Sequence, residues 1–169
     1  MFTSLFRRRA GPDIDPLYGA IMAAALRPHL YASFGVPDTF EGRFECATLH
    51  MALVLVRLRQ LPPPADAAGQ ALVDRFFDGL DAAIREKGIG DVAVPRRMKK
   101  FMQGFYGRVA AYEQAGGDPA ALAVAIGRNV LEGANASRDL VDDVIASQEA
   151  VMHASLEDLL ERPAQILPR

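Results

Sequence analysis

Residues 42–61 carry apolar side chains all round a helix, and this pattern limits the possible folds more than any other feature. At about 100° per residue, one apolar group falls on one side of the helix and a second group on another. A helix without a polar face must be covered on every side. The pattern therefore predicts a central, buried helix that ends at the prolines of positions 62–64. Its apolar residues are Phe44, Ala47, Met51, Val54 and Leu58 on the first side and Leu49, Leu53 and Val56 on the second.

Proline, glycine and capping residues divide the rest of the chain into further helical patterns. Asp-Pro pairs at 15–16 and 118–119 each combine an N-cap residue with a proline at the first helical position. No segment alternates as a strand would, so the sequence predicts an all-α fold, a compact single-domain bundle of about six helices. The expected helices run over 16–34 with a break at Pro28, over 42–61, from Asp66 to Gly88, from Pro95 to Gly116, from Pro119 to Gly133 and from Ser137 to just before Pro163.

Length and composition fit one domain between two less structured ends. A chain of 169 residues with 50% apolar and 24% charged residues has an ordinary globular composition. We expect a flexible N-terminal arm over residues 1–12, a helical domain over 13–162 and a C-terminal tail over 163–169. The segment from Phe2 to Arg9 combines bulky apolar residues with three arginines and could touch an anionic membrane surface peripherally. A lone cysteine, Cys46, fits a reducing compartment.

The charges are strongly segregated along the chain, although the formal net charge is only −2. Residues 95–112 hold five basic side chains and no acid, whereas residues 113–161 hold ten acids and two arginines. One surface could therefore attract anions. On the helix that begins at Pro95, basic residues and two glycines lie opposite the apolar arc, and interior glycines indicate a close neighbour. That neighbour is either another helix of the bundle or a partner, namely an extended polypeptide or RNA. The face comprises Arg96, Arg97, Lys100, Gly104, Gly107 and Arg108.

No residue pattern indicates an enzyme. Cys46 and His50 lie four residues apart on one helix, which could supply two metal ligands or a nucleophile and its base. No second histidine or cysteine lies near them in the sequence, so ordinary packing is the favoured interpretation. Asp142 and Asp143 are expected on the exposed side of their helix as solubilising charge. We expect no catalytic residue, no metal, no cofactor and no small-molecule substrate.

Several short motifs resemble the ubiquinol–cytochrome c chaperone family in their order and spacing. Each motif is weak by itself, but their joint order over about residues 17–115 is specific. The first group is Val36-Pro37-Asp38-Thr39, Gly42-Arg43-Phe44, Leu49-His50 and Arg57-Leu58. The second group is Ile84-Arg85-Glu86, Gly88-x-Gly90-Asp91, Val94, Met98-Lys99 and Phe105-Tyr106-Gly107-Arg108 followed by Tyr112.

The resemblance implies a non-enzymatic, all-helical chaperone that binds newly made or unassembled cytochrome b during assembly of the bc1 complex (complex III). Mitochondrial members act with a small helical co-chaperone near the ribosome exit and are membrane-associated on the matrix side. This chain resembles the shorter bacterial form, which implies a cytoplasmic location with peripheral contact at the inner face of the inner membrane. The client could also be another membrane protein. The alternative function is a ribosome-, RNA- or protein-binding module that uses the basic face.

The resemblance also suggests where a client would bind. A chaperone of this kind needs an apolar groove flanked by charges, and methionine adapts to varied clients. Met98, Met102 and Tyr112 could line such a groove or could belong to the core. The ring of Tyr106 joins the predicted partner-binding face.

Other motif residues are expected to hold the fold together. Asp38 or Thr39 could cap the central helix, and Arg43 could pair with Asp91 or Glu86. The full set with an expected structural role is Pro37, Asp38, Thr39, Arg43, Phe44, His50, Arg85, Glu86, Gly90 and Asp91.

Overall fold

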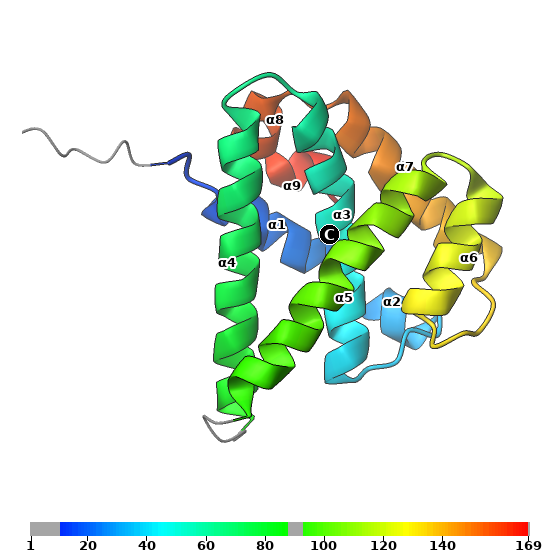
Figure 1. Ribbon diagram of the computed structural model, residues 1–169. Coiled ribbons are helices and arrows are strands. Elements are labelled where there is room, and N and C mark those ends of the chain that lie inside the picture. Colours follow the sequence, from blue (N-terminus) through cyan, green and yellow to red (C-terminus); the bar gives the residue numbers. More distant parts are fainter. Residues whose placement is uncertain (1–10, 88–92, 169) are drawn as a thin grey trace, which may run out of the picture.

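The computed structural model describes residues 11–87 and 93–168, and every regular element within these ranges is an α-helix (Figure 1). The predicted all-α bundle is therefore confirmed. The helices are α1 (Asp15–Ala25), α2 (Pro28–Ala32), α3 (Phe40–Gln60), α4 (Ala65–Glu86), α5 (Val94–Ala115), α6 (Pro119–Asn129), α7 (Arg138–His153), α8 (Leu156–Glu161) and α9 (Pro163–Ile166).

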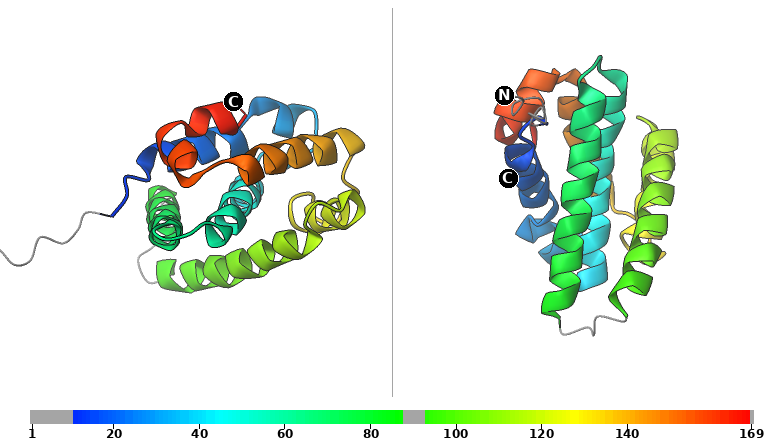
Figure 2. Two further views of the ribbon diagram at one scale, coloured as in Figure 1. Left: turned by 90° about the horizontal axis from the view of Figure 1, so that it is seen from above. Right: turned by 60° about the vertical axis from the view of Figure 1, so that its left-hand side comes forward.

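Helix α3 is the centre of the bundle, as its all-round apolar pattern predicts. Figure 2 shows α3 between α5 on one side and α1 and α7 on the other, and α4 packs along a further side. Every residue from Cys46 to Leu55 is buried. An unbroken buried run of more than two turns means that neighbours cover α3 on all sides.

The loop before α3 is held by its own polar residues. Thr39 is the N-cap, and its hydroxyl accepts a hydrogen bond from the amide of Gly42 at 3.0 Å. A Cβ atom on Gly42 would collide with the carbonyl oxygen of Pro37, so the loop can close onto the helix only at a glycine. Arg43 pairs with Asp38 at 2.8 Å and not with Glu86, while Asp91, the other expected partner, lies outside the described residues.

The structure confirms several helix boundaries and corrects others. The first helical pattern breaks before Pro28 into α1 and α2, and the side chains of Asp118 and Ser137 cap α6 and α7. The expected caps Asp15 and Asp66 instead lie in the first turns of α1 and α4. Acids stabilise a helix at that place through the positive end of the helix dipole, without a side-chain cap.

The C-terminal region differs from the single helix and loose tail that the sequence predicts. The helical pattern is interrupted at Ser155, which forms a capping box with Asp158 at the start of α8. Pro163 and Leu167 are buried, and α9 packs against α1. Residues 163–168 therefore complete the bundle. The spacing of the few apolar residues in this segment did not predict whether they are buried or exposed.

None of the described helices combines the length and the apolar character that crossing a bilayer requires. Most of the predicted N-terminal arm, residues 1–10, falls outside the described ranges.

Candidate protein-binding site

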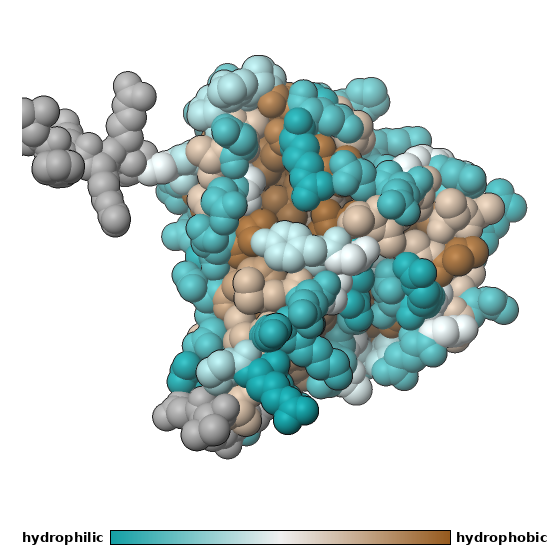
Figure 3. All heavy atoms as spheres, in the orientation of Figure 1, coloured by the Kyte–Doolittle hydropathy of each residue, from teal (hydrophilic) through white to brown (hydrophobic). Residues whose placement is uncertain are grey.

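Helices α4 and α5 diverge, and the C-terminal half of α3 lies between them (Figure 1). A groove of about 430 Å³ lies there, which we call the α4–α5 groove. In Figure 3 its surface is a band of apolar atoms on the face that Figure 1 presents. The residues that line it are Leu55, Leu58, Arg59, Leu61, Pro63, Ala65, Asp66, Gly69, Gln70, Val73 and Tyr106.

The floor of the groove is the C-terminal end of α3. Leu55, Leu58 and Leu61 follow one another at helical spacing, so they lie on one side. Gly69 of α4 faces this row, and a Cβ atom there would contact the side chain of Leu55 at 3.8 Å and that of Leu58 at 3.9 Å. These are ordinary contact distances, so the missing side chain of Gly69 widens the groove without any backbone requirement for glycine.

The rim of the groove along α5 carries an ion pair and an aromatic ring. Arg59 and Glu113 form an ion pair at 2.8 Å, and both side chains are about half exposed. Tyr106 lies on α5 with half of its surface exposed, and Met102, one turn earlier, is 41% exposed. Because residues four apart share a helix face, Met102 continues the surface that Tyr106 begins.

The basic face of α5 is accessible only in part. Arg96, Arg97 and Lys100 are exposed, as is Lys99. Within the described ranges none of these four forms an ion pair. The first turns of α5 therefore present a cluster of cations to solvent.

Arg108 does not belong to this face, contrary to the prediction. Its guanidinium pairs with Glu45 of α3, and the side chains are only 28% and 12% exposed. Burial raises the pKa of the Glu45 carboxyl, while Arg108 opposes that rise. The pair fastens α5 to the central helix.

The two glycines of α5 also differ from each other. A Cβ atom on Gly104 would collide with the guanidinium of Arg108, so the close neighbour of Gly104 is its own helix's side chain and not a partner. Gly107 is exposed and has no atom within 4 Å of a Cβ position. Close approach of a partner is thus open at Gly107 alone.

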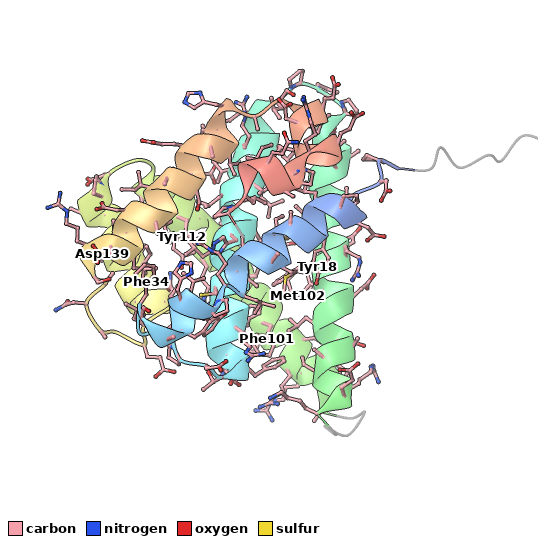
Figure 4. The ribbon with its side chains drawn as sticks, turned by 180° about the vertical axis from the view of Figure 1, so that it is seen from behind. Tyr18, Phe34, Phe101, Met102, Tyr112 and Asp139 are labelled. Carbon is pink, nitrogen blue, oxygen red and sulfur yellow. The ribbon has the colours of Figure 1, made fainter. Side chains whose placement is uncertain are left out.

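The three predicted groove residues lie in three different environments. Tyr112 has only 3% of its surface exposed and does not line the α4–α5 groove, but it lines a smaller hollow between α3, α5 and α7. Met98 is half-buried against the core. Met102 is the one exposed member of the three. Figure 4 places Tyr112 among the packed helices.

Two comparisons with known proteins gave a match. The family model described as ubiquinol-cytochrome C chaperone matches residues 32–165. This chain belongs to the ubiquinol–cytochrome c chaperone family. Among solved structures, the Cbp3 homolog from Brucella abortus is 40% identical with a TM-score of 0.75, and the match covers 85% of this chain and 82% of that one. A comparison with curated proteins gave no match.

Most of the motif residues that resemble the chaperone family serve the fold. Phe44 is buried and stacks on Phe76. Arg85 pairs with Asp81 at 2.6 Å, while Glu86 is exposed. Gly90 and Asp91 lie outside the described residues. Of the motif residues that the structure describes, Leu58 and Tyr106 line the α4–α5 groove.

Cys46 and His50 of this chaperone do not form a reactive pair. The Nδ1 atom of His50 lies 2.9 Å from the carbonyl oxygen of Cys46, so the ring donates to the backbone and not to the thiol. Burial raises the pKa of the Cys46 thiol to about 12 and lowers the pKa of His50 to about 4. Neutral, buried groups of this kind are packing residues. No three metal-ligating side chains come together within the ranges that the structure describes.

The groove itself was not predicted. Leu55, Leu61 and Gly69 were not singled out, because apolar residues at helical spacing indicate core in general. The one usable signal was Gly69, a glycine inside an amphipathic helix, which costs about 1 kcal/mol relative to alanine and so suggests a need for space.

Proposed function

We propose that this chain is an assembly chaperone for the bc1 complex that holds cytochrome b, or another membrane protein, in the α4–α5 groove. The family supplies the class of function. The observation that carries the site is the groove of about 430 Å³ itself, whose apolar lining includes the partly exposed Leu61, Val73 and Tyr106 above the buried Leu55 and Leu58.

The groove suits an apolar helix better than a compact ligand. A helix with its side chains is about 10 Å wide, so a volume of about 430 Å³ takes the side chains of one helix face and not the whole helix. Helix-in-groove binding uses anchors at positions such as i, i+3 and i+4. A membrane segment outside the bilayer has such apolar faces, and covering them prevents aggregation.

The residues at the rim of the groove suit reversible binding of a client. Met102 and Tyr106 offer adaptable and amphipathic contact area beside the floor. The exposed ion pair of Arg59 and Glu113 borders the apolar floor with charge and contributes little to stability itself. A client would therefore be gripped by its apolar side chains and released without breaking a buried polar contact.

We further propose that the chaperone works on the cytoplasmic face of the membrane that receives its client, in peripheral contact with it. A ribosome or a small helical co-chaperone would then use the exposed cations of α5, away from the groove. These partners follow from the family and from charge, and they are independent of the groove.

Filling the groove tests the proposed function. In Gly69→Leu the new side chain would point at Leu55 and Leu58 and occupy the client's place. We expect capture of cytochrome b during cell-free synthesis with membranes to fall about tenfold or more. Capture is measured by cross-linking at Met102 followed by affinity purification.

Gly19→Leu is the matched control, because Gly19 is an exposed helical glycine in α1 with no atom within 4 Å of a Cβ position. Both changes remove a helix glycine, so both should keep or raise the melting temperature. If folded Gly69→Leu captures as much cytochrome b as Gly19→Leu, the groove is not the client site. If the parent chain captures none, the proposed function itself is wrong.

The exposed cluster of Arg96, Arg97, Lys99 and Lys100 favours one second function, binding to ribosomal RNA. Four phosphate contacts to a single strand give a slope of about −3 for log affinity against log salt. Reversing Arg97 and Lys100 to glutamate should abolish this binding in a fluorescence anisotropy titration. If the affinity for RNA depends neither on the salt concentration nor on the two charge reversals, this second function is wrong.

A further inference from the structure

A second apolar hollow lies between α1, the start of α3 and the second half of α4. We call it the α1–α4 pocket, and its volume is about 250 Å³. Figure 4, which shows the molecule from behind, places Tyr18 on this side. Its apolar lining includes Tyr18, Met22, Phe40, Phe44, Phe76 and Leu80.

The pocket has a deep aromatic part and an open apolar mouth. The hydroxyl of Tyr18 would lie 2.7 Å from a Cβ atom on Gly79, so the absence of a side chain there lets the ring lie against α4. Leu26 also lines the pocket and is 40% exposed, although it is a large apolar residue. A chain of methylenes entering past Leu26 would meet aromatic rings on its way in.

Three cations stand at the edge of this apolar lining. The guanidinium of Arg75 lies 4.5 Å from the centroid of the Tyr18 ring, and the ammonium of Lys87 lies 4.9 Å from that of Phe40. Arg43 lines the pocket directly.

These cations are only partly neutralised. Arg75 pairs with Asp15 at 3.1 Å and Arg43 with Asp38 at 2.8 Å, and both acids are mostly exposed. Within the ranges that the structure describes, Lys87 pairs with no carboxylate. The mouth of the pocket thus carries more positive than negative charge, while its interior is apolar.

We propose that the α1–α4 pocket binds a free single-chain amphiphile with an anionic head, namely an alkyl carboxylate. The tail lies among the aromatic rings and the carboxylate lies beside Arg43, the cation that lines the pocket, in the positive field that Arg75 and Lys87 add from further along α4. A volume of about 250 Å³ is below the usual size of pockets for drug-sized molecules, which suits a narrow chain. This site does not depend on the proposed client groove, since the two hollows share no lining residue.

Binding of decanoate to the full chain, below the concentration at which it forms micelles, tests the proposal by calorimetry. Each added methylene should strengthen binding about fourfold from hexanoate upward, until the tail outgrows the pocket and the affinity levels off. Decyltrimethylammonium should bind at least tenfold more weakly than decanoate. Equal binding of the two head groups, or a gain that continues without a plateau, would overturn the proposal.

Two neighbouring alanines of α4 locate the site. Ala83 lines the pocket, and Ala83→Leu should weaken decanoate binding about tenfold or more. Ala82 is exposed, and Ala82→Leu should leave the affinity unchanged. Equal affinities in the two folded variants would place decanoate elsewhere and refute the pocket. If Ala83→Leu does not fold, the proposal is still tested by whether the affinity of the parent chain levels off as the alkyl chain lengthens.

Discussion

His50 shows how one buried residue makes the stability of this chaperone depend on pH. A carbonyl oxygen can only accept, so Nδ1 carries the proton in the contact with Cys46 and Nε2 is a bare acceptor. Nε2 is buried and has no hydrogen-bond partner within the described part of the chain. A proton on Nε2 would place a buried charge without a partner, and burial therefore lowers the pKa of His50 to about 4.

This depressed pKa predicts acid destabilisation. The unfolded chain has a histidine pKa of about 6.5, so between pH 6.5 and 4 the unfolded state binds more protons than the folded state. The free energy of unfolding should fall as pH falls through this window, by up to about 3 kcal/mol from His50.

Urea denaturation at several pH values measures the effect of His50. His50→Leu should remove most of the slope, because leucine fills the site and does not titrate. His153→Gln, a change at an exposed histidine, should keep the slope. Equal slopes in the parent chain and in His50→Leu would contradict the assigned role.

At the scale of elements, the pair of Arg108 and Glu45 joins α5 to α3. Arg108→Ala would leave a mostly buried carboxylate without its cation, and we expect a loss of about 2 kcal/mol in the free energy of unfolding. Arg97→Ala, at an exposed position of the same helix, should change it by less than about 0.5 kcal/mol. Chemical denaturation of both variants measures the difference.

The double variant Arg108→Ala with Glu45→Gln checks the cause. A neutral amide no longer needs the cation, so part of the lost stability should return relative to Arg108→Ala alone. If the double variant is less stable than the sum of the two single changes predicts, Arg108 stabilises α5 through something other than Glu45.

At the scale of the whole molecule, Arg27 and Asp143 join the turn between α1 and α2 to α7. Arg27, just before α2, is 5% exposed and makes two hydrogen bonds to Asp143 of α7, at 3.0 and 2.5 Å. Asp143 is thus a half-buried partner of a buried arginine, and its assignment as solubilising charge was wrong. It also lies 3.8 Å from His29.

Substitutions of two neighbouring acids of α7 distinguish a structural charge from a surface charge. Asp143→Ala should lower the free energy of unfolding by about 3 kcal/mol, because it leaves the Arg27 guanidinium buried without its partner. Asp142→Ala should cost about 0.5 kcal/mol or less, since among the described residues Asp142 pairs with the exposed Arg138 alone. Thermal and urea denaturation measure both, and similar losses would contradict the distinction.

The sequence by itself determined the class of fold and most of its helix boundaries. The all-round apolar pattern of residues 42–61 predicted the buried centre, Pro28 predicted the break between α1 and α2, and Asp118 and Ser137 predicted two caps. These features act within one or two helical turns, and propensity and capping are properties of such short stretches. They can therefore be read without knowing any distant neighbour.

Only the tertiary structure decided which polar residues are free and which apolar residues are covered. Periodicity put Arg97 and Arg108 on the same side of α5, yet Arg108 lies beside Glu45, 63 residues away, and Arg27 lies beside Asp143, 116 residues away. Met102 and Tyr106 lie on the same helix as the core residues Phe105 and Val109, but they are 41% and 50% exposed because no described helix covers their side of α5. A helical pattern fixes which residues share a face, whereas the angles at which distant helices pack decide what covers that face.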